Sequence, residues 1–401
     1  MSFLHVDLNS FYASCAVVKS NGQYCFDTPL MVCGDPKRRH GIVLAATYPV
    51  KRTGVRAGMP IREALARYPG AVMVAPDFRM YMDYSDRFMR IVRCYSPLIM
   101  RYGIDEAYLD YGGCERIFGP PLDLAHKLRE RVKNELGLTV SVGVGDNMLM
   151  AKMGSDYKKP DAVTVINAEN WQKLIWPMPV QSLMYVGKAT AAKLYTLGVR
   201  TVGDLAQTSA TLLKEIFGVC GTTLWRNANG MDDTRINCDP EQQKGVSKSI
   251  TLSQDACNLE EVCSALLMQT EDVAYRLRTL GMRAGVVGIH FRYGDMSGEG
   301  KQRTLSTPTD ATAELYDSVR SLAKELFHGR PVRQVGVRVT KLTAEPEQLL
   351  LFADTAHERR LRLDRATDAL RDRYGTEVLR RAGTLCFDHD EIDDFTPFVK
   401  N

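Results

Sequence analysis

The sequence has few of the features that mark exported, zinc-bound or membrane proteins. Its ten cysteines are scattered over 401 residues, with no Cys-x-x-Cys pair and no Cys/His cluster of zinc spacing. This pattern predicts reduced thiols and no zinc site. No apolar run approaches the length needed to cross a bilayer, and the chain does not open with a basic region followed by an apolar core. We therefore expect a cytoplasmic protein with no membrane association.

A strong charge of one sign is also missing. The chain has 52 Lys and Arg against 48 Asp and Glu, a net charge of +4. This balance permits nucleic-acid binding but does not indicate it, so local clusters of charge must decide. Hydrophobic residues make up 45% of the chain and charged residues 25%, which is ordinary for a folded protein, and the length suits two to four domains.

The chain does contain two adjacent carboxylates in an apolar setting. Asp105 and Glu106 lie between the apolar run 96–100 and the run 107–109, so we expect them where two β-strands meet. Buried carboxylates need a cation, a metal or strong hydrogen bonds to offset the loss of water. The alternative is a solvated turn, in which the two residues serve only solubility.

A third carboxylate occurs in a similar position near the start of the chain. Residues 3–6 form a β-like run that ends in Asp7, and a helical pattern over residues 11–15 follows directly. Together with Asp105 and Glu106, Asp7 forms a set that suits Mg²⁺, which prefers carboxylate and phosphate oxygens. The three residues predict phosphoryl transfer assisted by two metal ions.

Basic residues gather in residues 29–76, where short strands and helices alternate. A group of this kind is usually a solvated face. Beside a carboxylate metal site it would instead form the cationic wall that a triphosphate needs. Lys159 follows a helical pattern over residues 148–157, at the end where a cation is favourable. The group consists of Lys37, Arg38, Arg39, Lys51, Arg52, Arg56 and Arg62.

Periodicity divides the first part of the chain into two kinds of structure. Residues 1–166 alternate strands and helices and predict an α/β fold. After Trp171 the pattern becomes helical, with a turn at 183–190 that leads into a helix at 191–199. This element is either a helix-hairpin-helix, whose backbone amides bind phosphate, or a plain αα-hairpin.

A polar linker at 240–245 separates these parts from a second mixed region, residues 246–342. Strand-like runs at 286–291 and 335–339 and long helical patterns predict an α+β domain. Basic residues on its strands suit a sheet laid against a phosphate backbone, or an ordinary exposed face. They are Arg292, Arg333, Arg338 and Lys341.

Five segments occur in an order and spacing that, as a set, carry more information than any one of them. They are Val6–Ser14, Ala57–Pro60, Ile104–Asp110, Ser141–Val144 and the stretch from Ala151 to Pro160. Together they resemble the Y-family, or translesion, DNA polymerases over residues 1–340. Within that family, Asn9–Cys15 resembles the UmuC-like branch more than the DinB-like branch.

The resemblance implies a right-hand polymerase with an α/β and α+β multidomain fold. The palm would comprise residues 1–10 and 77–166, and small fingers residues 11–76. A helical thumb would comprise residues 167–239. After the linker, residues 246–342 would form the little finger, and residues 343–401 a C-terminal extension.

The resemblance also implies roles for individual residues. The catalytic carboxylates would be Asp7, Asp105 and Glu106, which with the backbone carbonyl of Leu8 would bind two Mg²⁺ ions. Tyr12 would be the steric gate against a ribose 2′-hydroxyl. The triphosphate would lie against Phe11, Tyr12, Tyr48, Lys51 or Arg52, and Lys159.

Two further points concern contacts with phosphates. Lys51 stands where the family has an arginine, and lysine lacks the bidentate fork, so either Lys51 or Arg52 would make that contact. DNA contacts would come from Gly187, Lys188 and Thr190 in the thumb and from Arg292 and Arg338 in the little finger.

The implied function is template-directed, error-prone translesion synthesis without proofreading, in DNA damage tolerance and the SOS response. Primer-template DNA, deoxynucleoside triphosphates and an accessory mutagenesis subunit would be its partners. A catalytically inactive accessory protein of the same fold is one rival, but retention of the three carboxylates and Tyr12 argues against it. A template-free nucleotidyl transferase such as a cyclase is another, but the little-finger region argues against it.

A short apolar segment after the last expected strand resembles the motif by which bacterial polymerases dock on the sliding clamp. It lies before an Arg-rich helical pattern at 358–374 and comprises Gln348, Leu349, Leu350, Leu351 and Phe352. Burial in a core is the common fate of such a run. Its position favours clamp binding, with Gln348, Leu349, Leu351 and Phe352 as contacts.

Overall fold

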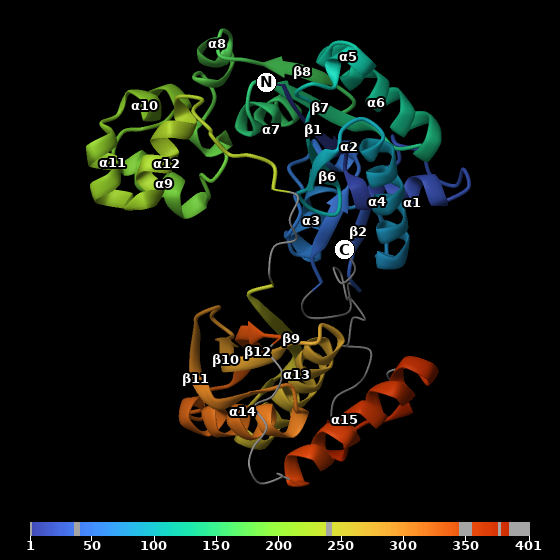
Figure 1. Ribbon diagram of the computed structural model, residues 1–401, viewed down its shortest axis with the longest axis vertical. Helices are drawn as coiled ribbons and strands as arrows, with labels where there is room; N and C mark the ends of the chain where they lie inside the picture. Colours follow the sequence, from blue (N-terminus) through green and yellow to red (C-terminus); the bar gives the residue numbers. More distant parts are fainter. Residues whose placement is uncertain (1, 36–40, 238–242, 345–354, 376–377, 385–401) are drawn as a thin grey trace. The chain divides into compact units, whose positions relative to one another are not determined.

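The computed structural model describes residues 2–35, 41–237, 243–344, 355–375 and 378–384. The chain divides into two compact units between residues 240 and 241. Each unit is described by itself (Figure 1). None of the helices in the described ranges has the length and hydrophobicity that a membrane crossing requires.

A five-stranded sheet forms the centre of the first unit (Figure 1). Its strands run in the order β5-β6-β1-β7-β8, and every neighbouring pair is antiparallel except β7 and β8. Strand β1 therefore lies in the middle, with neighbours on both sides. The strands are β1 Phe3–Leu8, β5 Leu98–Arg101, β6 Glu106–Asp110, β7 Val140–Gly145 and β8 Val163–Ile166.

The two faces of this sheet carry different residues because side chains alternate along a strand. From β1, Leu4, Val6 and Leu8 enter a hydrophobic core with helices α4 (Phe78–Arg93) and α6 (Pro121–Leu136). The alternate residues His5 and Asp7 face helix α7 (Met148–Tyr157) on the other side. The alternation thus places polar residues of β1 beneath a single helix.

Glycines on β7 allow α7 to lie unusually close to the sheet. A Cβ atom at Gly143 would lie 1.8 Å from the carbonyl oxygen of Ala151 and 2.4 Å from the amide nitrogen of Ser155. A Cβ at Gly145 would lie 2.4 Å from the amide nitrogen of Ala151. Side chains at these positions would push the helix away, so the two glycines set the distance between α7 and the strand beside β1.

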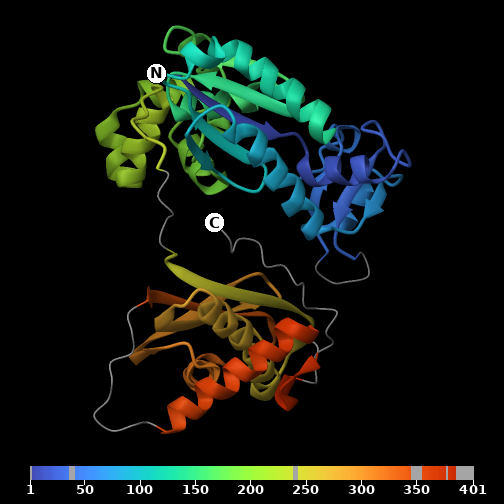
Figure 2. The same cartoon turned by 45° about the vertical axis from the view of Figure 1, so that its right-hand side comes forward.

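Two smaller parts complete the first unit. A three-stranded sheet of order β3-β2-β4 packs with short helices and stands apart from the large sheet in Figure 2. A group of helices shares a core with Leu149, Met150 and Met153 of α7. The first part comprises β2 Leu30–Cys33, β3 Val43–Ala46, β4 Val72–Val74, α1 Phe11–Lys19, α2 Tyr48–Lys51 and α3 Ile61–Arg67. The second comprises α8 Trp171–Ile175, a 3₁₀ turn Val180–Ser182, α9 Lys188–Thr196, α10 Val202–Gln207, α11 Ala210–Phe217 and α12 Val219–Ala228. One further short helix, α5 Glu115–Phe118, follows β6 in the chain.

The second unit is an antiparallel sheet of order β11-β10-β12-β9 covered by helices. Helices α13 and α14 bury their apolar faces against β10 and β12. The C-terminal helix α15 is held to α13 by the ion pair of Arg278 with Asp368, Nε to Oδ2 2.6 Å. The elements are β9 Gly245–Ala256, α13 Leu259–Thr279, β10 Arg283–Tyr293, β11 Gly298–Thr309, α14 Thr312–Leu326, β12 Val332–Thr343, α15 Thr355–Tyr374 and a 3₁₀ turn Ala382–Thr384.

Strands β9 and β11 are absent from the sequence-based expectations. Strand β11 is almost entirely polar and exposed, because it forms an edge of the sheet. Strand β9 alternates buried Val246, Ile250 and Leu252 with exposed serines, so its apolar content is low. Hydrophobic runs therefore revealed only the two central strands. The expected clamp-binding segment, Gln348–Phe352, lies outside the described residues.

Candidate active site

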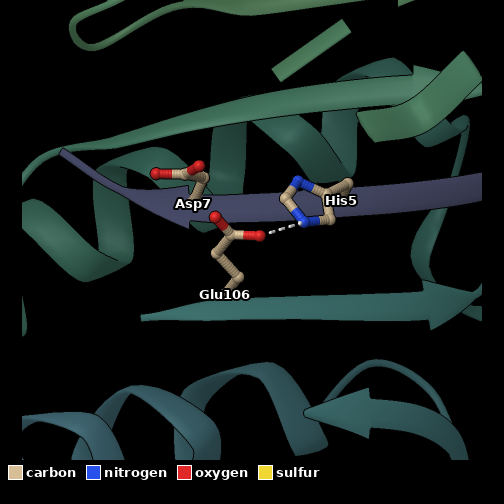
Figure 3. Close-up of side chains that lie close together, drawn as sticks. All are labelled: His5, Asp7 and Glu106. Carbon is tan, nitrogen blue, oxygen red and sulfur yellow. Dashed lines mark ion pairs between the residues drawn. The ribbon is translucent and has the colours of Figure 1, made fainter. Parts of the chain in front are cut away.

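The three predicted carboxylates come together at one end of the central strands. Asp7 on β1 pairs in register with Glu106, the first residue of β6. Asp105 precedes β6, and its carbonyl accepts a hydrogen bond from the amide of Leu8 at 3.0 Å. The sequence-based expectation that Asp105 and Glu106 lie where two strands meet is confirmed, and Figure 3 shows Asp7 and Glu106 on adjacent strands.

Two lysines neutralise part of this negative charge. Lys159 Nζ lies 2.7 Å from Asp7 Oδ2 and 2.8 Å from Asp156 Oδ1. Lys152 Nζ lies 3.0 Å from Glu106 Oε2 and 3.5 Å from Asp7 Oδ2. Burial opposes the charge on Lys159, but the carboxylates of Asp7 and Asp156 outweigh it and raise the pKa of its amino group.

Asp105 has no ion-pair partner among the residues that the structure describes. Burial raises its pKa to about 6, and the charges of Asp7 and Glu106 add to that shift. Burial also raises the pKa of Asp7, against the effect of its lysines. A third carboxylate without a cation is costly here unless a cation binds.

The pKa of Glu106 shifts in the opposite direction because of its neighbours His5 and Lys152. Burial disfavours its ionised form, but His5 and Lys152 outweigh that effect and lower the pKa of Glu106 to about 2. The His5 Nε2 atom lies 3.2 Å from Glu106 Oε2, as Figure 3 shows, and its Nδ1 lies 2.7 Å from Ser155 Oγ. Burial lowers the pKa of His5, and its ring lies between Ser155 and Glu106.

His5, Asp7 and Glu106 form the one group in the described ranges in which three or more His, Cys, Asp or Glu side chains could share a metal ion. One ligand atom from each lies within 4.8 Å of the others. His5 and Lys152 were missed by sequence reasoning. The signal for His5 was its position two residues before Asp7 on a strand, since such residues share a face.

A cavity of about 290 Å³ opens beside the carboxylates. Every residue that the sequence assigns to the metals or to the nucleotide lines it, except Arg52. Both Lys51 and Arg52 are exposed at the end of helix α2, where Arg52 is the C-cap, but Lys51 Nζ lies 2.7 Å from Ser10 Oγ at the cavity wall. The structure therefore places Lys51 in the cavity, rather than Arg52.

The ring of Tyr12 is fixed by other aromatic side chains. It stacks on Tyr81 with ring centroids 4.2 Å apart and meets the edge of Phe78 at 6.3 Å. Phe11 lies 5.5 Å away on the same helix. Stacked and edge-on rings of this kind restrict rotation. The half-buried ring of Tyr12 is therefore held by aromatic packing in the cavity wall.

The predicted DNA contacts lie outside this cavity. Gly187, Lys188 and Thr190 are at the start of α9, and a Cβ atom at Gly187 would have no other atom within 4 Å. Arg292 and Arg338 lie in the second unit, both exposed, on the face of its sheet opposite the buried Val287, Ile289 and Phe291.

Three family models match the chain. The model of the impB/mucB/samB family matches residues 6–156, and that of its C-terminal domain matches residues 243–351. The model of the DNA polymerase-iota thumb domain matches residues 182–232.

Curated relatives match along nearly the whole chain. DNA polymerase IV of Pelotomaculum thermopropionicum is 38% identical over 389 residues, covering 95% of both chains. That of Moorella thermoacetica is 38% identical over 390 residues, covering 96% of both. DNA polymerase IV 2 of Bacillus subtilis is 32% identical over 389 residues, covering 95% of this chain and 93% of that one.

Solved structures share the fold. A Y-family polymerase chimera of Dbh and Dpo4 has a TM-score of 0.74 at 23% identity, covering 86% of this chain and 100% of that one. An insertion ternary complex of Dbh DNA polymerase has a TM-score of 0.56 at 23% identity, covering 86% and 100%. The right-hand fold with palm, fingers, thumb and little finger is thereby confirmed.

The expectation of a UmuC-like branch is wrong, because these relatives are DNA polymerases IV. The first residue of the segment that suggested it, Asn9, has a structural role. Asn9 donates from Nδ2 to Ser141 Oγ at 2.9 Å and accepts from the amide of Asp161 at 2.8 Å. From this match, the chain belongs to the DinB-like branch of the bacterial Y-family DNA polymerases and is a translesion, DNA-directed DNA polymerase.

Proposed function

We propose that the chain extends a primer on a DNA template with two Mg²⁺ ions held by Asp7, the Leu8 carbonyl, Asp105 and Glu106. The observation that carries this proposal is the clustering of three carboxylates in a cavity lined by Tyr12 and two lysines. All of these donors are oxygens, which Mg²⁺ prefers. The carboxylate without a cation partner, Asp105, is a further reason to expect a metal.

The bound ions would lower the pKa of the primer 3′-hydroxyl and offset charge on the transferred phosphoryl group. The chain's own residues would do the positioning. Lys51 and Lys159 at the cavity wall would hold the triphosphate, with Phe11 and Tyr48 beside it. Lys159, which pairs with Asp7 at 2.7 Å, would exchange that carboxylate for phosphate oxygens.

DNA would be held by surfaces away from the cavity. The amides at the start of α9, with Gly187, Lys188 and Thr190, suit a phosphate without reading sequence. Arg292 and Arg338 lie on the open face of the second sheet and suit the backbone of a duplex. The domain boundaries expected from the sequence, 1–10 with 77–166, 11–76, 167–239, 246–342 and 343–401, are part of the same proposal.

Several further properties stay predictions that follow from the family. They are error-prone synthesis without proofreading, a role in the SOS response, an accessory mutagenesis subunit and a cytoplasmic location. Clamp binding by Gln348–Phe352 is supported by its place between β12 and α15. Segments that connect two elements often carry the residues that bind a partner.

Asp105→Asn or Glu106→Gln should reduce primer extension by at least about a hundredfold, because each removes a charged metal ligand. Affinity for primer-template DNA should stay close to that of the unaltered protein, since basic surfaces elsewhere bind the duplex. Single-nucleotide extension and fluorescence anisotropy measure the two effects. Glu130→Gln on the exposed side of α6 is the matched control. Extension at a normal rate by either variant would refute the metal assignment.

Tyr12→Ala should raise incorporation of ribonucleotides relative to deoxynucleotides by about tenfold or more, because it removes the ring that would contact a 2′-hydroxyl. Tyr12→Phe keeps the ring and should leave the ratio unchanged. Steady-state kinetics with the matched nucleotide pairs measure the ratio. If Tyr12→Ala discriminates as well as the unaltered enzyme, another residue is the steric gate.

Replacement of both Leu351 and Phe352 by alanine tests the clamp proposal. Clamp binding and clamp-stimulated synthesis should fall together, while the melting temperature and synthesis without clamp stay nearly unchanged. Surface plasmon resonance and primer extension with loaded clamp measure these effects. If the segment were buried, the same change would cost roughly 2–5 kcal/mol per residue and lower the melting temperature.

A further inference from the structure

Tyr185 adopts a backbone conformation that side chains rarely occupy. It lies in the turn between the 3₁₀ turn Val180–Ser182 and helix α9, and its φ is 70°. Glycine is the usual residue in this left-handed region, and a bulky residue there is strained. Burial of the Tyr185 ring does not offset this strain, because the residue is 66% exposed. Strain that the fold does not need is a reason to look for a function.

The neighbours of Tyr185 connect it to the catalytic turn. Partial burial, the phenol of Tyr102 and the carboxylate of Asp232 together raise its pKa. Tyr102 lies in the turn between β5 and β6, where its amide donates to the carbonyl of Glu106 at 3.0 Å. Tyr102 is 44% exposed and precedes Asp105 by three residues. Two exposed phenols from different parts of the unit are therefore neighbours, and Tyr102 belongs to the turn that carries Asp105.

Aromatic contacts anchor this pair to the sheet. The ring of Tyr102 meets the edge of Tyr108 with centroids 5.4 Å apart, and Tyr108 meets the edge of His5 at 4.4 Å. Tyr108 is buried and His5 contacts Glu106. A row of rings thus leads from the carboxylates to the turn that precedes α9. The outer end of the row, Tyr102 and Tyr185, is the part that a ligand can reach.

We infer the ligand of this surface from the groups that the proposed function places at its two ends. The proposed function places the primer 3′ end at the carboxylates and a phosphate at the amides that open α9. The strand between these points is the primer, and its sugars are the apolar parts of a nucleic-acid backbone. Aromatic rings offer a large apolar surface that can pack on these sugars without reading sequence, as a polymerase requires.

We propose that Tyr102 and Tyr185 form a contact surface for the deoxyribose rings of the last few primer nucleotides. The proposal rests on the proposed function and adds to it a second place where sugar structure is sensed. Tyr12 would test the sugar of the incoming nucleotide, and this pair would test sugars already in the primer. The exposed ring of Tyr185 offsets its backbone strain only when the primer is bound.

Tyr185→Gly separates function from folding, because glycine relieves the strain while removing the ring. We expect an equal or higher melting temperature, with a dissociation constant for primer-template DNA raised about tenfold. Tyr185→Phe should bind almost normally. The matched control is Tyr195→Ala, which removes a 44% exposed tyrosine from the last turn of α9 and should leave binding unchanged.

A modified primer identifies the sugar as the ligand. A primer with 2′-O-methyl groups on its last three sugars should bind the unaltered protein less tightly than the plain primer, and Tyr185→Gly should lose most of that difference. Equal affinity of Tyr185→Gly and the unaltered protein, a fall in melting temperature that accompanies weaker binding, or an undiminished 2′-O-methyl effect would each overturn the proposal. Failure of the unaltered protein to extend any primer would refute the proposed function instead.

Discussion

The site depends on how this chain compensates three carboxylates that its sheet brings together. Lys159 and Lys152 pair with Asp7 and Glu106, and Asp105 has no such partner among the described residues. Two cations for three carboxylates leave the cluster negative, and burial makes that charge costly. Binding of a metal ion to this site would therefore be favourable, and so would binding of a triphosphate that pairs with Lys159 in place of Asp7. The same residues therefore favour the substrate complex over the empty protein.

Helix α7 makes this arrangement possible. It supplies both Lys152 and Ser155, and it reaches the sheet only because Gly143 and Gly145 have no side chains. Ser155 fixes His5, and His5 holds Glu106. Packing between α7 and β7 thus sets the position of the Glu106 carboxylate, although Glu106 belongs to β6. The chemistry depends on backbone spacing as much as on the ionisable groups.

Sequence patterns could predict the features that depend on residues close together in the chain, such as strand ends. Asp7 lies one residue before the end of β1 and Glu106 begins β6, close to the strand ends where the sequence predicts them, and the observed register pairs the two residues. Residues whose role arises from tertiary packing could not be found this way. Lys152 sits on a helix where a lysine is ordinary, and the edge strand β11 lacks the apolar pattern that marks central strands. The strain at Tyr185 is a backbone property, which composition does not reveal.

A crystal structure with primer-template DNA, a non-hydrolysable deoxynucleoside triphosphate and Mn²⁺ in place of Mg²⁺ tests the central claim most directly. The account predicts two anomalous peaks, each within about 2.0–2.3 Å of carboxylate oxygens from Asp7, Asp105 or Glu106. It also predicts that Lys159 has left Asp7 for the triphosphate. Metal peaks that avoid Asp105, or a Lys159 still paired with Asp7 beside bound nucleotide, would contradict it.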